Sequence, residues 1–302
     1  MILLWGLPGD TPLSSVGDVL TRRRKKSFFL DQHDSLEWSI ELDVDDSISG
    51  CLRNGRRRLD LADVTAAYIR PYDARELPLA SELRALTHAL NLGDALLSWA
   101  DMTSAKIVNR PWAMSPNNSK PYQSLQIRSL GFSIPETLIT TDPEAAQEFW
   151  ERQGTVIYKS VSSVRSIVSR LSPAHALRLK SVRWCPTQFQ QYIAGTDYRV
   201  HVVGERLFPS MIQSQADDYR YAGLNGRSAE IKAAHLPKHV ADRCRRLAAA
   251  ISLPVAGIDL RVTPAGEWYC FEVNPSPGFS YYQQATGQPI AEAIADFLAS
   301  DS

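Results

Sequence analysis

An excess of charge of either sign is missing from this chain of 302 residues. Its 33 lysines and arginines balance 33 acidic residues, so the formal net charge is zero. Without excess positive charge, a protein gains no long-range attraction to nucleic acid or to anionic membranes. One basic run, Arg22–Lys26, is the exception, and we expect it to be the solvated end of a helix. The sequence therefore predicts neither a nucleic-acid nor a membrane partner.

Long apolar runs are also missing, and none approaches the roughly 20 residues that span a bilayer. The apolar start, Met1–Trp5, is short and has no basic flank, so we expect a first strand there and not a signal peptide.

Cysteine is scarce, and its spacing does not match a zinc site. We expect the cysteines to be reduced and mostly buried, as in a cytoplasmic protein. They are Cys51, Cys185, Cys244 and Cys270.

The length favours roughly two to three domains. Residues 1–100 alternate predicted strands and helices, as in a small α/β domain. In residues 101–186, a loop rich in Pro, Asn and Ser precedes a helix and alternating strands. Residues 187–302 carry predicted hairpins, a basic amphipathic helix at Lys238–Ile251 and a terminal helix. The predicted fold class is α/β, built from α+β subdomains, with no internal repeat.

The most informative stretch predicts two strands joined by a turn at Pro264–Gly266. One strand carries Asp259, and the other carries Glu272 and Asn274. Residues two apart on a strand share a face, so Glu272 and Asn274 point the same way. Three converging hard oxygen ligands are what Mg²⁺ needs when it also holds phosphate oxygens. These three residues are our candidate metal ligands.

A hairpin with ordinary surface carboxylates is the alternative. It is disfavoured because both acids are flanked by strongly apolar residues. The same alternation places Cys270 on the face of Glu272, where we expect a structural role for it. It also places Arg261 on the face of Asp259, where Arg261 is a candidate to contact phosphate or a substrate carboxylate.

Further motifs precede this hairpin. Lys120 begins a predicted helix, Lys159 ends a short strand, and Gln190–Ile193 forms a strand or linker. In the run Asp197-Tyr-Arg199, the acid and the arginine share a strand face. In this order the pieces resemble the ATP-grasp superfamily, over roughly residues 105–300. The resemblance implies two α+β subdomains that clasp ATP between antiparallel sheets, behind a small N-terminal α/β pre-ATP-grasp domain.

The resemblance implies a role for each of these residues. The two lysines reach the nucleotide phosphates, because an ammonium is a compact charge suited to phosphate oxygens. The linker backbone binds the edge of adenine, and the arginine fork reaches the transferring phosphoryl group. For the acid of the Asp-Tyr-Arg run, an ordinary cross-strand ion pair is an equal alternative. The cofactor-binding candidates are Lys120, Lys159, Gln190, Gln191, Tyr192, Ile193 and Asp197, and the catalytic candidates are Arg199, Lys159 and Arg261.

Glycine is missing from the loop after Lys159, where related enzymes place a glycine-rich lid over the phosphates. Ser163 stands in the glycine position, and Arg165 can meet an anion; both are cofactor-binding candidates, with a solvated serine loop as the alternative. A second long polar stretch, which carries Arg220 and Arg227, is either a functional lid or a disordered segment. The expected cofactors are ATP and Mg²⁺, with Mn²⁺ as an alternative metal.

Within the superfamily the chain is most similar to microviridin-type peptide-modifying ligases, the graspetide synthetases, which are related to ribosomal-protein glutamate ligases. It departs from them at Pro275–Gly278, where Pro-Ser-Pro-Gly is closer to the glutamate-ligase branch. The runs that carry the resemblance are Tyr68–Pro71, Val108–Ala113, Ser119–Gln123, Pro135–Leu138, Ile157–Val161, Val164–Val168 and Ala291–Leu298.

The resemblance implies that a side-chain carboxylate of a ribosomally made precursor peptide attacks the γ-phosphate of ATP. A Ser/Thr hydroxyl or a Lys amine then captures the acyl-phosphate, which gives an ester or amide crosslink. A ligase of free amino acids or another small molecule is one alternative, and a non-catalytic nucleotide-binding protein is another. The implied partner is the precursor peptide, with leader-dependent binding and a homodimer both left open.

Overall fold

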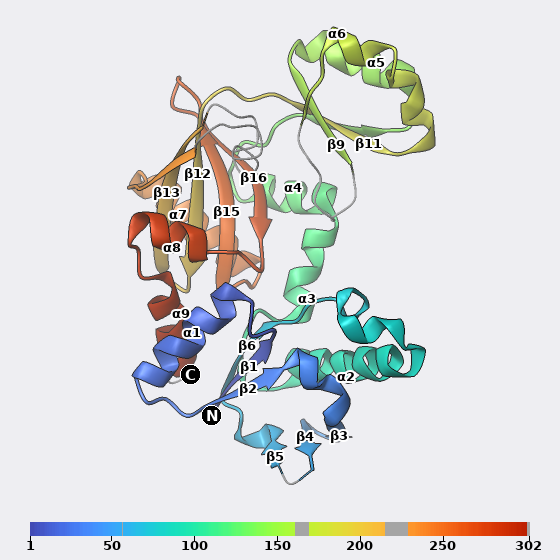
Figure 1. Cartoon of the computed structure of the whole chain (residues 1–302). Coiled ribbons are helices and arrows are strands. Elements are labelled where there is room, and N and C mark those ends of the chain that lie inside the picture. Colours follow the sequence, from blue (N-terminus) through green and yellow to red (C-terminus); the bar gives the residue numbers. More distant parts are fainter. Residues whose placement is uncertain (56, 161–168, 215–228, 301–302) are drawn as a thin grey trace.

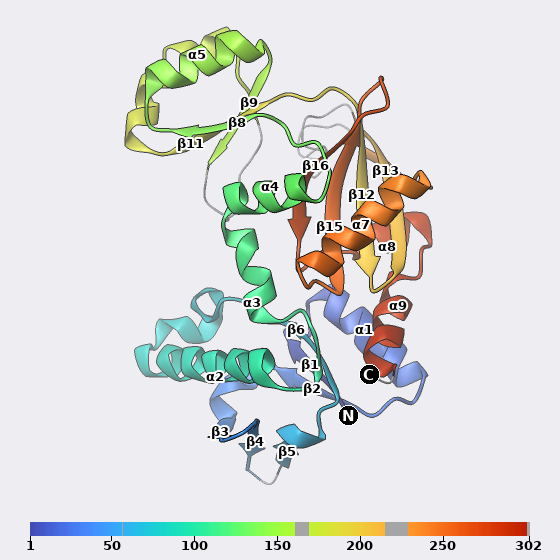
Figure 2. The same cartoon turned by 180° about the vertical axis from the view of Figure 1, so that it is seen from behind.

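The computed structural model describes residues 1–55, 57–160, 169–214 and 229–300, and these form four β-sheets in three parts of the molecule. Figure 1 shows the N-terminal part at the bottom, the central part at the upper right and the C-terminal part at the left. Figure 2 shows the same arrangement from behind.

The N-terminal part is a parallel sheet with helices on both faces. Its strands, in sheet order, are β2 (Ser27–Asp31), β1 (Ile2–Gly6), β6 (Ala66–Arg70) and β7 (Lys106–Val108). Parallel strands are covered on both faces, which fits the continuous burial of β1. The sheet includes β7, so it extends past residue 100, where we drew the first domain boundary.

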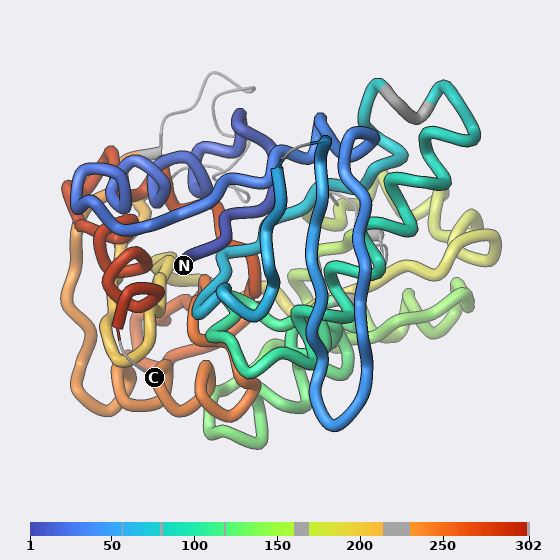
Figure 3. Tube along the Cα trace, turned by 90° about the horizontal axis from the view of Figure 1, so that it is seen from below, coloured from blue at the N-terminus to red at the C-terminus, as the bar shows by residue number. Residues whose placement is uncertain are grey.

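Helices from both ends of the chain cover this sheet. On one face pack α1 (Thr11–Arg22) and α9 (Ile290–Ala299), and on the other packs α2 (Leu83–Met102). Figure 3 shows α1 beside α9, so the last helix of the chain belongs to the core of the first part. The basic run at the end of α1 contributes Arg22 and Arg23 to ion pairs with Glu292 and Asp296 of α9.

A small antiparallel meander adjoins the N-terminal sheet. Its strands are β3 (Ser39–Val44), β4 (Ile48–Asn54) and β5 (Arg57–Asp60). The buried residues Leu52 and Leu59 join the same apolar cluster as Trp99 of α2. The meander therefore extends the core on the α2 side of the parallel sheet.

The central part is a four-stranded antiparallel sheet under one long helix. Its strands, in sheet order, are β10 (Ser169–Arg170), β9 (Val156–Ser160), β11 (Thr187–Gln191) and β8 (Thr137–Thr140). Helix α5 (Pro143–Gln153) begins at Asp142, whose side chain accepts from the Glu144 backbone N–H. Its Phe149 packs on Phe189 of the sheet. Short α6 (Pro173–Ala176) follows β10.

The C-terminal part is a five-stranded antiparallel sheet. Its strands, in sheet order, are β14 (Ala229–Ala233), β13 (Arg206–Ser214), β12 (Thr196–Val203), β15 (Val255–Val262) and β16 (Trp268–Asn274). Helix α7 (Lys238–Ala250) packs on one face, and α8 (Ser280–Thr286) lies on the opposite face (Figures 1 and 2). The predicted hairpin is confirmed as β15 and β16.

The hairpin contains a β-bulge that the sequence did not predict. The register is Asp259 with Glu272 and then Leu260 with Cys270, so one residue, Phe271, is extra. A bulge shifts the alternation of side chains by one position. The expectation that Cys270 shares a face with Glu272 was therefore wrong: Cys270 is buried against α7.

Two short helices connect the N-terminal part to the central part. They are α3 (Pro111–Met114) and α4 (Lys120–Ser129), and α4 lies between the central sheet and β16 (Figure 2).

In the described part of the chain, no helix has the length and apolar character needed to cross a membrane. Three of the cysteines are buried as expected, Cys185 is exposed, and none forms a disulfide.

Candidate active site

One face of the C-terminal sheet gathers Arg199 and the three candidate metal ligands. The register sets Arg199 of β12 opposite Asp259, and Asp259 opposite Glu272. Two residues along, Asn274 lies opposite Gly257. Regular alternation puts Glu272 and Asn274 on the face of Asp259, while Val273 and, beyond the bulge, Cys270 pack into the core. The structure thus brings the three candidate metal ligands to adjoining positions.

Arg199 lies across this face and binds one of the acids. Its Nη1 donates to Oδ1 of Asp259 at 2.6 Å, and its side chain is only 8 % exposed. A buried charge is tolerated only where an opposite charge or hydrogen bonds compensate it. The guanidinium occupies the space above Gly257, where a Cβ would lie 2.6 Å from Cζ of Arg199. Glycine at this position therefore makes room for the arginine.

Lys120 reaches the second acid from the central part. Its Nζ lies 3.5 Å from Oε1 of Glu272. One helical turn later, Gln123 is buried, donates to the Val273 carbonyl at 2.8 Å and accepts from the Val273 N–H at 3.0 Å. β16 is the edge strand of its sheet, so this amide continues the ladder as another strand would. Gln123, which the sequence did not single out, holds Lys120 beside Glu272.

Arg261 braces the linker between the two sheets. It donates to both carboxylate oxygens of Asp197, at 2.6 and 2.9 Å, and to the Ile193 carbonyl at 2.6 Å. Asp197 faces Arg261 across β12 and β15, so the structure contains the cross-strand ion pair that was one alternative for Asp197. A two-pronged pair of this kind fixes both partners in orientation. The catalytic role of Arg261 stays a prediction.

The linker residues themselves are bonded within the protein. Gln190 is buried and donates to Oγ1 of Thr137 at 3.0 Å. The backbone N–H groups of Gln191 and Tyr192 donate to carbonyls of Glu136 and Thr155. Adenine would therefore have to bond groups of the linker other than these two N–H groups, or a second lone pair of a linker carbonyl.

Lys159 lies on the sheet of the central part. In the register it faces Gln188, whose side chain is buried on the sheet face away from α5. The structure therefore places Lys159 on the face that looks toward α4. The predicted lid residues Ser163 and Arg165, and also Arg220 and Arg227, lie outside the described residues.

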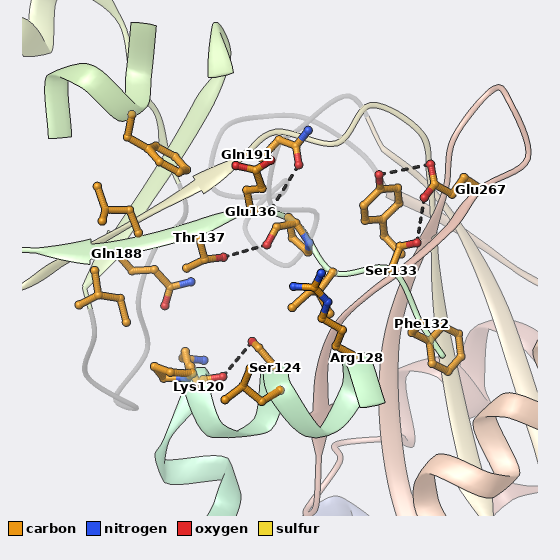
Figure 4. Close-up of a pocket in the computed structure, with 18 of the residues that line it drawn as sticks. Lys120, Ser124, Arg128, Phe132, Ser133, Glu136, Thr137, Gln188, Gln191 and Glu267 are labelled. Atoms are coloured by element: carbon orange, nitrogen blue, oxygen red, sulfur yellow. Dashed lines mark hydrogen bonds between the residues drawn. The ribbon is translucent and has the colours of Figure 1, made fainter. Parts of the chain in front are cut away.

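A cleft of about 1040 Å³ opens between α4 and the central sheet (Figure 4). Lys120 and Ser124 of α4 form one wall, and Thr137 and Gln188 of the sheet form the other. At the end away from Lys120 lies Glu267, which accepts from the hydroxyl of Ser133 at 2.8 Å. The cleft therefore runs from the cation beside Glu272 to the turn of the C-terminal hairpin.

The donor set on the C-terminal sheet fits a hard divalent cation. Two carboxylates and one amide oxygen are ligands that Mg²⁺ accepts when phosphate oxygens and water complete its shell. In this structure the carboxylates face the cations Arg199 and Lys120, which balance their charge. The Asn274 side-chain oxygen accepts from the Ser276 N–H at 2.9 Å, which fixes the direction of its lone pairs.

His201 lies two residues beyond Arg199 on β12, and the sequence did not single it out. It is 1 % exposed, and its ring meets that of Tyr282 edge-on at 4.9 Å between centroids. Burial, helped by the nearby charge of Arg199, lowers the pKa of His201 well below its ordinary value. The imidazole is therefore neutral beside the guanidinium.

The model of the RimK-like ATP-grasp domain matches residues 120–298. The chain belongs to this family. Among curated proteins it is 24 % identical over 226 residues to a probable alpha-L-glutamate ligase of Alkalilimnicola ehrlichii, covering 70 % of this chain and 72 % of that protein. A probable alpha-L-glutamate ligase of Teredinibacter turnerae is 26 % identical over 246 residues, covering 76 % and 80 % of the two chains.

Solved structures extend the match over the whole fold. The ATP-grasp ligase PsnB, complexed with a variant of its minimal precursor, Mg and ADP, superposes with a TM-score of 0.84 at 24 % identity, over 98 % of this chain and 97 % of that one. The macrocyclase MdnC of Microcystis aeruginosa, bound with precursor peptide MdnA, has a TM-score of 0.84 at 22 % identity, over 99 % of both chains. The predicted ATP-grasp fold is confirmed, and the protein is an ATP-dependent ligase.

The fit of Arg199 over Gly257 generates a first prediction. In the Gly257→Ala variant the new methyl displaces the guanidinium from Asp259, so turnover falls by about 100-fold. Steady-state kinetics of ATP hydrolysis or ligation measures this. Gly93→Ala, in α2 of the N-terminal part, where a Cβ meets nothing within 4 Å, is the control and keeps parent activity. Parent activity in Gly257→Ala would show that the arginine does not need this space.

The neutral state of His201 generates a second prediction. The pKa of His201 is lower in the folded protein than in the unfolded chain. Between the folded-state pKa and about pH 6.5, only the unfolded chain therefore binds the proton. Stability is therefore full above pH 6.5 and is lost on acidification, by up to about 1.4 kcal/mol per pH unit. Melting temperatures from pH 7.5 to 5 should fall more steeply in the parent than in His201→Gln. Parallel curves would contradict the assignment.

Proposed function

We propose that this ligase activates a side-chain carboxylate of a ribosomally made peptide and joins it to a hydroxyl or amine of the same peptide. The observation that carries the proposal is the set of Arg199 and the two acids on one sheet face, together with Lys120 of α4, which lies beside Glu272 and lines a cleft of about 1040 Å³. This volume is at the upper end for small-molecule sites, so it has room for a peptide segment beside a nucleotide.

The chemistry proceeds in two displacements. A carboxylate oxygen attacks the γ-phosphorus of ATP, the bond between the β- and γ-phosphoryl groups breaks, and ADP leaves. The hydroxyl or amine then attacks the acyl carbon, loses its proton, and expels phosphate. The products are an ester or an amide, ADP and phosphate. The carboxylate oxygen that attacked the phosphorus leaves with the phosphate, so the peptide becomes lighter by one water.

The residues of the chain divide this work. Arg199 would stabilise the charge that develops on a transferring phosphoryl group, a task that suits a buried guanidinium fork. Lys120 and Lys159, from the central part, would bind the phosphate oxygens. Asp259, Glu272 and Asn274 would hold Mg²⁺, which neutralises phosphate charge when it is bound. The Arg261–Asp197 pair keeps the linker in place.

The whole-chain likeness supports a peptide as the substrate. PsnB and MdnC were both solved with precursor peptides, and their likeness to this chain includes the N-terminal part. A free amino acid as the acceptor or donor is the second candidate. It is favoured by the curated relatives, which are named probable alpha-L-glutamate ligases, and by Pro275–Gly278 after Asn274.

The two candidates differ in the mass of the product. The purified protein is incubated with ATP, Mg²⁺ and a short precursor peptide encoded beside its gene, and the peptide is weighed by mass spectrometry. We expect the loss of one water for each bond formed. A parallel reaction also contains free glutamate. If the peptide gains the mass of glutamyl units in that reaction and loses no water in the reaction without glutamate, the free-amino-acid candidate is favoured and the peptide-crosslinking candidate is overturned.

The metal assignment generates a third prediction. Glu272→Gln keeps the shape of the side chain but removes its charge, so ligation should fall at least about 100-fold, since even changes beyond the ligands of a metal cost about 10- to 100-fold. Glu230→Gln changes an exposed side chain on β14 of the same sheet; it is the matched control and keeps parent activity. Equal rates in the two variants, each checked for an unchanged melting temperature, would sink the assignment.

A further inference from the structure

The loop that follows the candidate metal ligand Asn274 lies against the N-terminal part. Arg70, the last residue of β6, donates from Nη1 to the Ser276 hydroxyl at 2.8 Å and to the Pro277 carbonyl at 3.3 Å. These contacts join positions 206 and 207 residues apart in the chain. The loop is thus held by a part of the molecule that supplies none of the three proposed ligands.

Arg70 is itself fixed by a buried acid. Its Nε and Nη2 donate to the two oxygens of Asp10 at 2.8 and 3.2 Å. The side chains of Arg70 and Asp10 are only 10 % and 5 % exposed. Asp10 also caps α1 by accepting from the Leu13 N–H at 2.8 Å. A guanidinium bound by two prongs to a capped, buried carboxylate has little freedom to rotate.

A second contact fixes the same loop from the end of β7. Asn109 is 3 % exposed, and its Nδ2 donates to the carbonyls of Pro275 and Val255. Its Oδ1 accepts from the Val255 N–H at 3.2 Å. Val255 begins β15 and Pro275 follows β16, so one side chain ties together the two open ends of the hairpin that carries the acids.

The path from Arg70 to the metal site has one further step. The Ser276 N–H donates to Oδ1 of Asn274 at 2.9 Å, the same oxygen that would coordinate the metal. Arg70 holds the side chain of Ser276, and Ser276 orients the amide of Asn274. A ligand that is already oriented loses less entropy when it coordinates a metal.

We propose that Arg70, held by Asp10, is a positioning residue for the metal site, and that it acts through Ser276 on Asn274. Metal affinity then depends on the N-terminal part, which becomes a working component of the active site in addition to any role in binding a peptide. The inference rests on the proposed function, because it takes Asn274 as a metal ligand.

The experiment measures metal binding directly, without turnover. Mn²⁺ is titrated into the protein saturated with ADP, and free Mn²⁺ is followed by electron paramagnetic resonance. We expect Arg70→Lys, which keeps the charge but loses the two-pronged geometry, to weaken Mn²⁺ binding by about 10-fold. Ser276→Ala, which leaves the Asp10–Arg70 pair intact, should weaken it about as much. Arg53→Lys, an exposed residue paired with Glu41 in the same part, is the control and should match the parent.

Two companion measurements separate positioning from folding. ADP affinity in the presence of EDTA should be unchanged in Arg70→Lys and Ser276→Ala, and ligation should recover toward the parent rate at high Mg²⁺. A loss that persists at saturating Mg²⁺ would indicate a structural role and overturn the inference.

The Asn274→Ala variant separates this inference from the proposed function. Weak Mn²⁺ binding in Asn274→Ala, together with parent affinity in both Arg70→Lys and Ser276→Ala, overturns the positioning role and leaves the metal assignment standing. Parent affinity in Asn274→Ala itself overturns the metal assignment, and the positioning role falls with it.

Discussion

The site depends on two carboxylates, Asp259 and Glu272, that face each other across neighbouring strands. Like charges directly opposite on a sheet destabilise it. Here each acid faces a cation: Arg199 binds the first, and Lys120 lies beside the second. The two carboxylates are therefore stabilised in the absence of a divalent ion. When such an ion binds them, Arg199 and Lys120 can bind phosphate oxygens instead. Gly257 and Gln123 serve this charge balance, one by leaving space for the arginine and the other by anchoring the helix of the lysine.

The hairpin that carries these acids is held along its length by other parts of the molecule. At its edge, Gln123 completes the ladder of β16, and the Cys270 N–H donates to the Ser133 carbonyl. At its open end, Asn109 bonds Val255 of β15 and Pro275, the residue after β16. Because ligand positions must be held within a fraction of an ångström for metal chemistry, a hairpin tied at edge and end is a better platform than an isolated one.

Sequence periodicity predicted the faces correctly wherever the strands are regular. It placed Glu272 beside Asn274, and it placed Asp197 and Arg199 on the face where the structure has them. It failed at Cys270, because the bulge at Phe271 has no glycine to mark it in the sequence and reverses every position beyond it. The alternation of side chains along a strand also predicts only which face of the sheet a residue lies on, and not which residue it contacts. The partners of Gln123 and Arg70 lie 150 and 206 residues away, so no local pattern could have found them.

The residues that activate a carboxylate do not by themselves choose the acceptor. Acyl-phosphate formation needs the same cations and metal ligands whether the carboxylate belongs to a peptide or to a free amino acid. Under the proposed function, discrimination would arise in the cleft, where side chains such as Thr137, Glu267 and Tyr269 line the path away from Lys120. Glu267 accepts hydrogen bonds from both Ser133 and Tyr269, so its carboxylate is fixed in direction. If the substrate is the peptide that we propose, this acid can accept a hydrogen bond from a donor group that lies several residues from the reacting atom, a group that a single amino acid does not have.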